Sequence, residues 1–507
     1  MRQSSLFFSC AAATAVMCSA QTLPNVVFIM ADDIGPGDIE VFQKRFSRKS
    51  LVSTPTLDRL VEEGITFENA RTPASLCAPT RWAVMTGNYN YRCHKPWGIW
   101  GAFEPNKIED DQLTLGRVMK QAGYTTAFFG KWGFGAEWNA QDSDEIYTGN
   151  EYGKDGVDIS RIVRGGPSDL GFDYSVTLPA GIQNVPYAFY ENDEWMPLSE
   201  ISVIRHLTWK DMPKGVELGK KAGKGDSAWD PRRAGPILVE KATAFIERNA
   251  GKQPFFVYYC SQAVHHPHCP PETFNGKPVA GTTPSKHLDM VNEFDMQVEA
   301  LVQSLKKTGV YDNTLIVVTS DNGGMGENNY VPETIAAGHD STAGLREDKG
   351  AIYDGGSRVP MIAVWPGHIV PGSTSSEPVM VQDILATLAA LTGQKIKKSD
   401  AMDSRDLLPL MTGEPGAEGH DVMVVQGSAD QGSYTAIIKD GWKLVIESTK
   451  WDGTIRKPFA LFNLNDNPLE DESRNLIRNP EQAFRVKEFM KLNDELRDGK
   501  RRTEPVL

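Results

Sequence analysis

Two apolar, β-branched-rich runs that each end in a polar pair constrain the fold of this chain more than any other feature. Residues 24–31 read PNVVFIMA and are followed by Asp32-Asp33, and residues 314–320 read TLIVVTS and are followed by Asp321-Asn322. Runs of this length and composition predict buried strands. In an open α/β sheet the carboxyl ends of parallel strands converge on one crevice. We therefore expect these two polar pairs, although far apart in sequence, to meet at one site.

The rest of the first 393 residues alternates between strand-like and helix-like segments. Strands are predicted at 124–129, 255–260 and 315–320, and helices at 113–121, 235–248 and 288–307. This alternation is typical of a mostly parallel sheet with helices on both faces. Residues 135–232 break the rhythm and are rich in Gly, Asp, Tyr and Trp. We interpret them as a long excursion near the site.

The character of the sequence changes after residue 393. Short strand candidates at 422–426, 434–438 and 442–446 are joined by turns, and a final helix is predicted at about 480–496. This pattern predicts a smaller C-terminal α+β subdomain built on a short antiparallel sheet. The expected division is a catalytic domain over 21–393 and a subdomain over 394–507.

The first twenty residues have the features of a secretory signal peptide. Arg2 precedes an apolar stretch over 6–17, and Cys18-Ser19-Ala20 fits a small-x-small cleavage site. The stretch is too short to span a bilayer, and no later segment predicts a membrane span. We expect residues 1–20 to be removed and the protein to be exported to the periplasm or the medium. Four cysteines would remain, and whether Cys260 and Cys269 pair stays open.

The charge of the chain limits its partners. The formal net charge is −13, which argues against nonspecific binding of nucleic acid. A site for an anionic ligand would need concentrated positive charge to override this global field. The basic pair Lys220-Lys221 reads as a solvated loop.

Cys77 opens the run Cys77-Ala78-Pro79-Thr80-Arg81, which leads to Thr86-Gly87. The pentapeptide alone also fits a buried cysteine near a proline turn. Together with the two polar pairs, however, it resembles the signature of type I sulfatases. In that family the cysteine is oxidised after synthesis to formylglycine (3-oxoalanine), whose hydrate provides an oxygen nucleophile. The resemblance implies an alkaline-phosphatase-like α/β fold, sulfuric ester hydrolase activity, and a formylglycine-generating or anaerobic maturation enzyme as partner.

Asp32, Asp33, Asp321 and Asn322 form an all-oxygen set of candidate metal ligands. Such hard ligands suit Ca²⁺ or Mg²⁺ and disfavour zinc. The resemblance implies Ca²⁺, with the modified side chain of Cys77 as a further ligand; Mg²⁺ fits the same set.

Pro79 favours the first turn of a helix, which would place Cys77 at a helix N-terminus where negative charge is stabilised. Arg81 lies one turn further in. There it can hold both the developing oxyanion and the metal ligands.

Two lysines lie in segments that are similar to sulfatase blocks. Lys131 follows a predicted strand in FGKWGFG, and Lys349 lies in LREDKG. The resemblance implies that both bind sulfate. Related sulfatases often carry a histidine two residues after the first lysine, where this chain has Gly133. Which group takes the diol proton therefore stays open, and His94 is one candidate.

The run HHPHCP over 265–270 contains a proline-histidine-x-proline segment like that of the family. The resemblance implies that His268 donates the proton to the leaving alcohol, and imidazole titrates in the right range for general acid catalysis. Lys349, His265 and His339 are alternatives. The spacing of these histidines does not match a zinc helix.

The implied reaction is hydrolysis of a sulfate ester on a polysaccharide or oligosaccharide, and the overall similarity favours a carrageenan galactose sulfate. A glycosaminoglycan or fucan sulfate, a formylglycine phosphodiesterase and an inactive carbohydrate-binding homologue are the alternatives. Indoles in the loops near these motifs can stack on sugars or pack in the core: Trp97, Trp100, Trp132 and Trp138. The expected substrate-binding residues are His94, Trp100, His339 and Arg346.

Overall fold

The computed structural model of the protein describes residues 23–45, 50–150, 156–327, 329–397, 399–429, 432–448 and 456–497. The expected signal peptide over 1–20 lies outside the described residues. None of the helices in these ranges is long and apolar enough to cross a membrane.

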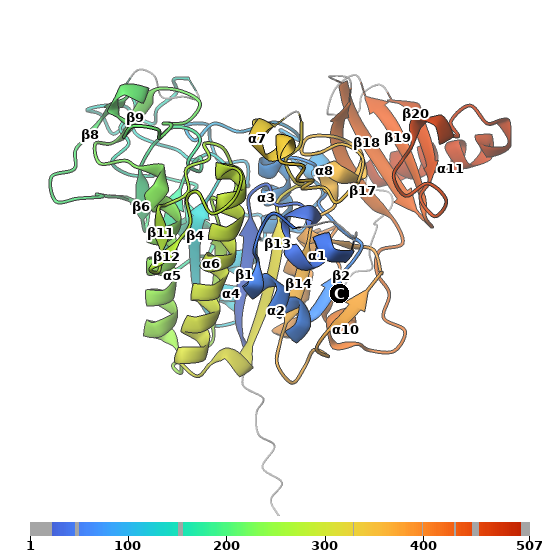
Figure 1. Ribbon diagram of the computed structural model, residues 1–507, viewed down its shortest axis with the longest axis horizontal. Helices are drawn as coiled ribbons and strands as arrows, with labels where there is room; N and C mark the ends of the chain where they lie inside the picture. The colour runs from blue at the N-terminus through green and yellow to red at the C-terminus, as the bar shows by residue number, and fades with distance from the viewer. Residues whose placement is uncertain are drawn as a thin grey trace, which may run out of the picture.

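A ten-stranded sheet forms the centre of the molecule (Figure 1). Its five middle strands are parallel and run in the spatial order β13, β1, β10, β4, β5. This arrangement confirms the predicted mostly parallel sheet. The bounds of these strands are β1 Asn25–Ala31, β4 Thr125–Lys131, β5 Tyr174–Leu178, β10 Phe255–Cys260 and β13 Thr314–Ser320.

Shorter strands extend the sheet at both edges. Beyond β13 lie β14 (Met361–Val364), β2 (Ile65–Phe67) and β15 (Ser373–Ser375), with β14 antiparallel to both of its neighbours. Beyond β5 lie β6 (Phe189–Glu191), which is antiparallel to β5, and β7 (Glu194–Met196), which is antiparallel to β6. The excursion over 135–232 therefore contributes three strands to the sheet. It also forms a separate antiparallel pair, β8 (Ile204–Leu207) and β9 (Gly223–Asp226).

Helices cover both faces of the sheet because alternate side chains of each buried strand point to opposite faces. Along β1, Val27 and Ile29 pack into one apolar cluster, whereas Val26 and Phe28 pack into the other. The first cluster includes residues of α2 (Pro55–Glu63), α5 (Ala234–Asn249) and α6 (Lys286–Lys307). The second includes residues of α3 (Cys77–Thr86), α4 (Leu115–Gln121) and α9 (Ile384–Leu391).

A second, smaller sheet follows near the C-terminus, beside the upper part of the main sheet in Figure 1. Its four antiparallel strands are β17 (Met423–Ala429), β18 (Gly432–Lys439), β19 (Trp442–Ser448) and β20 (Arg456–Asn463). Phe489, Leu492 and Leu496 of α11 (Ala483–Arg497) join the apolar core of this sheet. The predicted C-terminal α+β unit is confirmed. The remaining short elements are α1 Glu40–Arg45, β3 Ala70–Arg71, β11 Thr273–Phe274, β12 Lys277–Pro278, α7 Pro332–Ala336, α8 Asp354–Ser357, β16 Val379–Met380 and α10 Leu408–Thr412.

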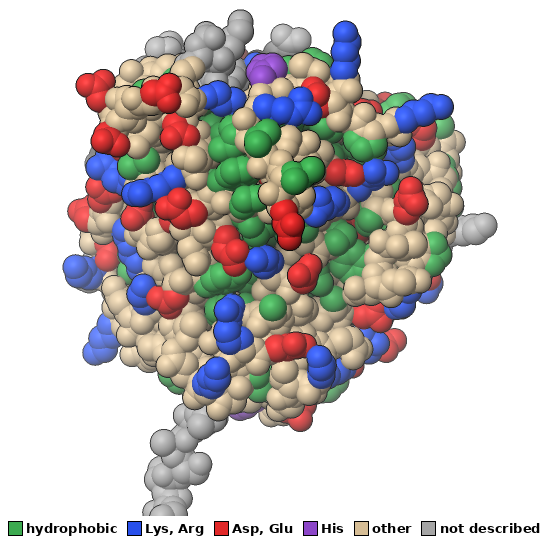
Figure 2. Space-filling model, turned by 90° about the vertical axis from the view of Figure 1, so that its left-hand side faces the viewer, with side chains coloured by type: hydrophobic (Ala, Val, Ile, Leu, Met, Phe, Trp, Pro, Cys, Tyr) green, Lys and Arg blue, Asp and Glu red, His purple; other side chains and the backbone are tan. Residues whose placement is uncertain are grey.

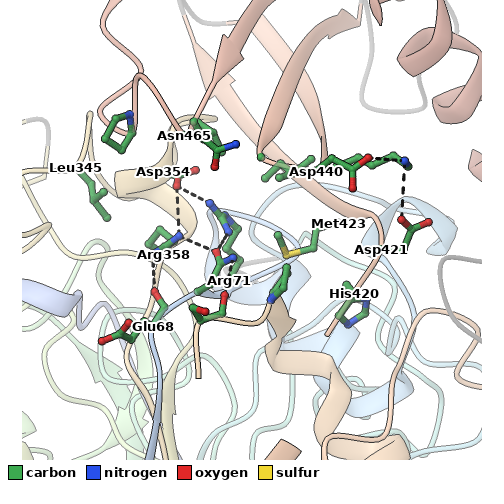
Figure 3. A pocket seen from close by; sticks show the side chains of 18 residues that line it. Glu68, Arg71, Leu345, Asp354, Arg358, His420, Asp421, Met423, Asp440 and Asn465 are labelled. Carbon is green, nitrogen blue, oxygen red and sulfur yellow. Dashed lines mark hydrogen bonds and ion pairs between the residues drawn. The ribbon is translucent and has the colours of Figure 1, made fainter. Parts of the chain in front are cut away.

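Buried ion pairs link the smaller sheet to α8 and β3. Lys443 of β19 lies 3.0 Å from Asp354 and 2.7 Å from Glu470, and Arg71 lies 2.6 Å from the same Asp354. All four side chains are buried. Figure 3 shows the pocket of about 360 Å³ beside this junction, with Arg71 and Asp354 joined at its centre. We name this group (Arg71, Asp354, Lys443, Glu470) the junction cluster.

The face of the molecule drawn in Figure 2, which carries β8 and β9, shows Lys and Arg side chains interspersed with Asp and Glu. Positive charge is thus mixed with negative charge over this face. A mixed surface of this kind fits the overall acidic balance of the chain.

Candidate active site

The two polar pairs meet at the carboxyl edge of the sheet, as the sequence predicts. The backbone N–H of Asp33 donates to Asp321 Oδ1 at 3.1 Å, and Asn322 Nδ2 donates to Asp33 Oδ1 at 2.9 Å. Asp32 and the other three side chains are all buried. In Figure 1, α3, α7 and α8 gather over this edge.

Three cations face the three carboxylates. Arg81 Nη2 lies 2.7 Å from Asp321 Oδ2, Lys131 Nζ lies 2.8 Å from Asp32 Oδ2, and Lys349 Nζ lies 2.6 Å from Asp33 Oδ1. Burial of opposite charges at these distances is tolerated because each is matched by a partner.

The electrostatics of the cluster differ from one carboxylate to the other. Burial raises the pKa of Asp32, and Lys131 only partly offsets it. Burial would also raise the pKa of Asp33, but Lys349, His265 and Lys131 together lower it. The pKa of Lys349 is raised, because the neighbouring carboxylates outweigh the burial of its ammonium. The lysine therefore stays positively charged at the centre of the site.

Cys77 is the first residue of α3 and is buried. The helix ends at Gly87, whose φ of 67° permits the left-handed cap, with its N–H bonded to Ala83 O. The predicted position of Cys77 at a helix N-terminus is thus confirmed. A pocket of about 150 Å³ surrounds it, lined among others by Trp100, Lys131, Gly133, Gln183, Asn184, Lys220 and Lys221.

The oxygen-rich set fits a hard divalent cation. Asn322 Oδ1 is buried and has no hydrogen-bond partner, which is what a carbonyl ligand of such an ion would show. The ligand atoms of Asp32, Asp33 and His265 lie within 4.8 Å of one another. Since Ca²⁺ and Mg²⁺ take oxygen ligands, the residues that would hold the ion are Asp32, Asp33, Asp321 and Asn322.

The histidine nearest to this cluster is His265, whereas the sequence analysis chose His268. The segments that follow β1 and β10 continue to pair beyond the ends of these strands. Asp32 N–H donates to Ala263 O at 2.9 Å, and Val264 N–H donates to Asp32 O at 2.6 Å. This pairing brings His265 Nε2 to 3.9 Å from Asp33 Oδ2. Burial and then Lys349 lower the pKa of His265.

His268 lies in a neighbouring pocket instead. Its ring packs edge-on against His287 at 5.2 Å and lies 5.8 Å from His266. Burial, followed by His287, lowers the pKa of His268 to about 3. Asp33 still acts electrostatically on His268, and the role of His268 as proton donor stays a prediction.

The four expected substrate-binding residues separate in space. Trp100 lines the pocket of Cys77, but His94 is exposed, 3.4 Å from Glu109, and does not line that pocket. His339 is buried and bonded to Asp38 at 2.8 Å. Arg346 lies 3.6 Å over the Tyr353 ring and donates to the backbone of Glu470. Of the four, only Trp100 lines the pocket of Cys77. Trp132 and Trp138 are buried in the apolar clusters, so their role is core packing.

Sequence reasoning missed the loop that returns from the excursion. Lys220 and Lys221 are exposed, as the sequence predicts for a solvated loop, and both also line the pocket of Cys77. Burial, followed by Lys349, lowers the pKa of Lys220. A Cβ added at Gly133 would approach only Arg81 Cδ, at 3.9 Å, so the place of the absent histidine is open space beside these lysines. The sequence feature that indicates this part of the pocket is the pair of adjacent lysines in an otherwise acidic chain.

The open question about the cysteines is answered by the geometry. Cys260 and Cys269 are both buried, unpaired thiols, as are Cys77 and Cys93. Burial raises the pKa of Cys260 and of Cys269 to about 11, which keeps both as neutral thiols.

A buried oxygen-rich cluster at the carboxyl edge of a mostly parallel sheet flanked by helices, beside two lysines, defines an α/β protein with an alkaline-phosphatase-like fold. A family model described as Sulfatase matches residues 24–394, and the chain belongs to this family, which fits the type I, formylglycine-dependent sulfatases. It is a sulfuric ester hydrolase.

The chain is similar to several curated proteins and solved structures. The chain is 28% identical over 484 residues to an N-acetylgalactosamine-6-O-sulfatase of Bacteroides thetaiotaomicron, covering 88% of each chain. A solved 6S-sulfatase from glycosaminoglycan metabolism in the same organism superposes with a TM-score of 0.79 at 26% identity, covering 94% of this chain and 99% of the other. Ps i-CgsB in complex with k-i-k-neocarrahexaose shares the fold, with a TM-score of 0.65 at 22% identity and coverage of 94% and 93%.

Proposed function

We propose that this protein removes a sulfate ester from a galactose-type sugar of an oligosaccharide or polysaccharide, using a formylglycine made from Cys77 and a bound calcium ion. The observation that carries the proposal is the position of Cys77 at the N-terminus of α3, in a pocket with Lys131 and beside the buried oxygen-rich set. This arrangement supports attack on an anionic ester held by cations.

The acidic residues of the site would bind the cation, and the other residues would act on the ester. Asp32, Asp33, Asp321 and Asn322 would hold Ca²⁺, with Mg²⁺ as the alternative, and the bound ion would stabilise negative charge on the sulfate oxygens. The hydrated aldehyde at position 77 would supply the nucleophilic oxygen. Arg81 fixes the carboxylate of Asp321.

Lys131 and Lys349 would bind the sulfate group itself. Both ammonium groups lie within the cluster, close to carboxylates that a cation would also engage. A divalent ion at Asp32 and Asp33 would compete with the lysines for the same oxygens, which leaves the ammonium groups able to donate to sulfate. Lys220 also lines the pocket of Cys77.

We assign proton donation to the leaving alcohol to His265. It lies 3.9 Å from Asp33 and near Lys349, so an ester bound at these groups would come within its reach. Negative charge on a bound sulfate raises the pKa of a nearby imidazole, which favours the protonated acid that this step needs. His268, which packs against His287, is the alternative donor.

The substrate proposal rests on the relatives. The N-acetylgalactosamine-6-O-sulfatase is matched over 88% of both chains and supports N-acetylgalactosamine 6-sulfate. The sequence-based expectation of a carrageenan galactose sulfate shares the galactose configuration. We therefore propose a galactose-type ring as the common feature. We also propose that residues 1–20 direct export and that the catalytic domain ends at 393, just after α9.

The test is production of the protein together with a maturation system. The mass of the peptide that contains Cys77 should shift from thiol to aldehyde, and the purified protein should retain calcium. Release of sulfate should then be followed across defined sulfated oligosaccharides, with N-acetylgalactosamine 6-sulfate and carrageenan fragments first. An unmodified Cys77 would contradict the nucleophile. Faster turnover of phosphodiesters would favour the phosphodiesterase alternative, and ligand binding without any turnover would favour the inactive homologue.

A further inference from the structure

The connection between β8 and β9 carries a concentration of positive charge. Residues 208–222, which we name the basic loop, contain four lysines and two acidic residues in a chain whose net charge is −13. All four lysines are exposed: Lys210, Lys214, Lys220 and Lys221. Both acidic side chains already have partners, because Asp211 lies 2.7 Å from Arg205. Glu217 lies 3.0 Å from His266. The lysines therefore give the loop a local field that attracts anions.

The end of the basic loop lies in the pocket of Cys77. Lys220 and Lys221 line that pocket together with Lys131, and none of the described residues that line it is acidic. Lys131 is paired with Asp32 at 2.8 Å. Lys220, in contrast, forms no ion pair and no side-chain hydrogen bond within the described part of the chain. The pocket of the nucleophile thus includes an accessible ammonium group without a counter-charge.

Lys220 lies within electrostatic reach of the catalytic centre. Burial, and then Lys349, lowers the pKa of Lys220, whereas Cys77 raises it. At the centre itself the three carboxylates are matched by the three cations that pair with them. The positive charge of Lys220 is therefore additional, and a bound anion would compensate it.

The turn that presents the two lysines is fixed through its backbone. Lys220 N–H donates to Gln183 O at 2.9 Å, and Tyr187 Oη donates to Lys221 O at 2.5 Å. A Cβ at Gly219 would lie 2.7 Å from Gln183 O, so only glycine permits this close approach. Because the backbone is already held, ordering a lysine on a ligand costs only side-chain entropy.

A neighbouring amide offers a further hydrogen-bond donor. Asn184 lines the same pocket as the two lysines. Its Oδ1 accepts from the backbone N–H of Val185 at 3.1 Å, which leaves its amide nitrogen to donate. Ammonium and amide donors together match a ligand rich in acceptors, such as the oxygens of a sulfate or a carboxylate.

We infer that Lys220, with Lys221 and Asn184 beside it, binds a second anionic group of the substrate, a sulfate or a carboxylate. This inference rests on the proposed function and specifies its substrate: the favoured sugar carries a negative charge besides the ester that is cleaved. The scissile sulfate goes to Lys131 and Lys349 at the carboxylate cluster, and the second anion goes to the end of the basic loop. That anion can be a further sulfate on the same ring or a uronate on the neighbouring ring.

The test compares a variant that loses the charge with two controls. Lys220→Gln keeps a polar side chain but removes the charge, and Lys220→Arg restores the charge. Lys210→Gln removes an exposed lysine of the same loop that does not line the pocket. KM and kcat are measured on N-acetylgalactosamine 6-sulfate and its 4,6-disulfate. They are also measured on a 6-sulfated disaccharide with a neighbouring uronate and on the uncharged methyl ester of that uronate.

Wild type should have a lower KM for the disulfate than for the monosulfate, or for the uronate than for its methyl ester, and the pair that differs identifies the source of the anion. Lys220→Gln should raise the favoured KM about tenfold, which corresponds to the loss of one charge-assisted contact, and the KM of the less charged partner much less. Lys220→Arg should recover most of the affinity, and Lys210→Gln should match wild type. The inference is overturned if wild type prefers neither charged substrate. It is also overturned if Lys220→Gln loses equally on both members of each pair, a result that would assign Lys220 to the scissile sulfate.

Binding without turnover separates this inference from the proposed function. The same sugars are titrated calorimetrically into the Cys77→Ser protein, with and without Lys220→Gln. If wild type cleaves none of the esters, the proposed function fails. The inference then stands if the Cys77→Ser protein binds a doubly charged sugar more tightly than its less charged partner and the added Lys220→Gln change removes that difference. It falls if the difference is absent or survives the change.

Discussion

Replacing Lys349 with methionine should separate the cation's role in stability from the lysine's role in binding sulfate. The change removes an ammonium 2.6 Å from Asp33 Oδ1, and the side chain of Asp33 is fully buried. Two unit charges about 3 Å apart interact by roughly 5–6 kcal/mol at an effective dielectric constant of about 20. Removing one partner of a buried pair costs about 3–5 kcal/mol, because the other charge is left uncompensated. Asp33 keeps its bond from Asn322 and its neighbour His265, so we expect about 3 kcal/mol.

Calcium should reverse much of that loss. Lys349→Met removes the ammonium from both oxygens of Asp33, so calcium should bind the variant more tightly than wild type; a difference of about 100-fold in Kd would return roughly 2.7 kcal/mol of the deficit at saturating calcium. Urea unfolding, followed by tryptophan fluorescence, should therefore show a large deficit for Lys349→Met in EDTA and a small one in excess calcium. Activity on sulfate esters should be lost in both conditions.

Lys44→Met is the matched control for this experiment. Lys44 also pairs with a carboxylate, Glu40 at 2.8 Å, but its side chain is 61% exposed, so the variant should unfold like wild type. The reasoning is refuted if Lys349→Met is as stable in EDTA as Lys44→Met. It is equally refuted if the deficit of Lys349→Met is the same with and without calcium.

Three further predictions follow from the site and its surroundings. Cys77→Ser should abolish multiple turnover while leaving folding and substrate binding intact, since serine cannot form the diol; ordinary steady-state rates in that variant would exclude the mechanism. His265→Ala should lose about 10²- to 10⁴-fold in kcat on a sugar sulfate and much less on an aryl sulfate with a good leaving group. His268→Ala should mainly raise KM for the sugar sulfate. The opposite pattern would assign the role of general acid to His268. Burial raises the pKa of Glu293 to about 8, above its value in the unfolded chain, so the protonated carboxyl contributes stability that is fully present below about pH 4.5 and lost as the pH rises through about 8. The midpoint of urea unfolding should therefore differ between pH 5.5 and pH 9 in wild type, and differ less in Glu293→Gln. An equal difference in the two proteins would show that Glu293 is not the cause.

The central strands could be predicted from the sequence because strands of a parallel sheet are buried on both faces. β1, β10 and β13 therefore read as continuous apolar runs of four or more residues. β5 and β14 were missed because they are short and lie within long irregular segments. The antiparallel direction of β14 is set by its connection and by pairing with β2, neither of which composition reveals.

The acidic half of the site was predictable for the same reason: Asp32 and Asp321 directly follow strands whose ends converge. The choice among the histidines was not. Three of them lie within four residues, and the backbone pairing of Asp32 with Ala263 and Val264 decides which one faces Asp33. Lys220 was also beyond reach, because only the return of the excursion over the sheet brings it to Cys77. Local patterns locate strand ends, whereas long-range packing decides which loop residues reach them.

The junction cluster has a consequence for the order in which this polypeptide can mature. As the chain leaves the ribosome, Arg71 and Asp354 are present long before Lys443 and Glu470 have been synthesised. Asp354 lies only five residues after Lys349, on the segment that carries this lysine to the active site. The ion pair of Asp354 with Lys443 therefore forms only after β19 has been made. A nascent chain halted before β19 would have Asp354 paired with Arg71 alone among the members of the junction cluster.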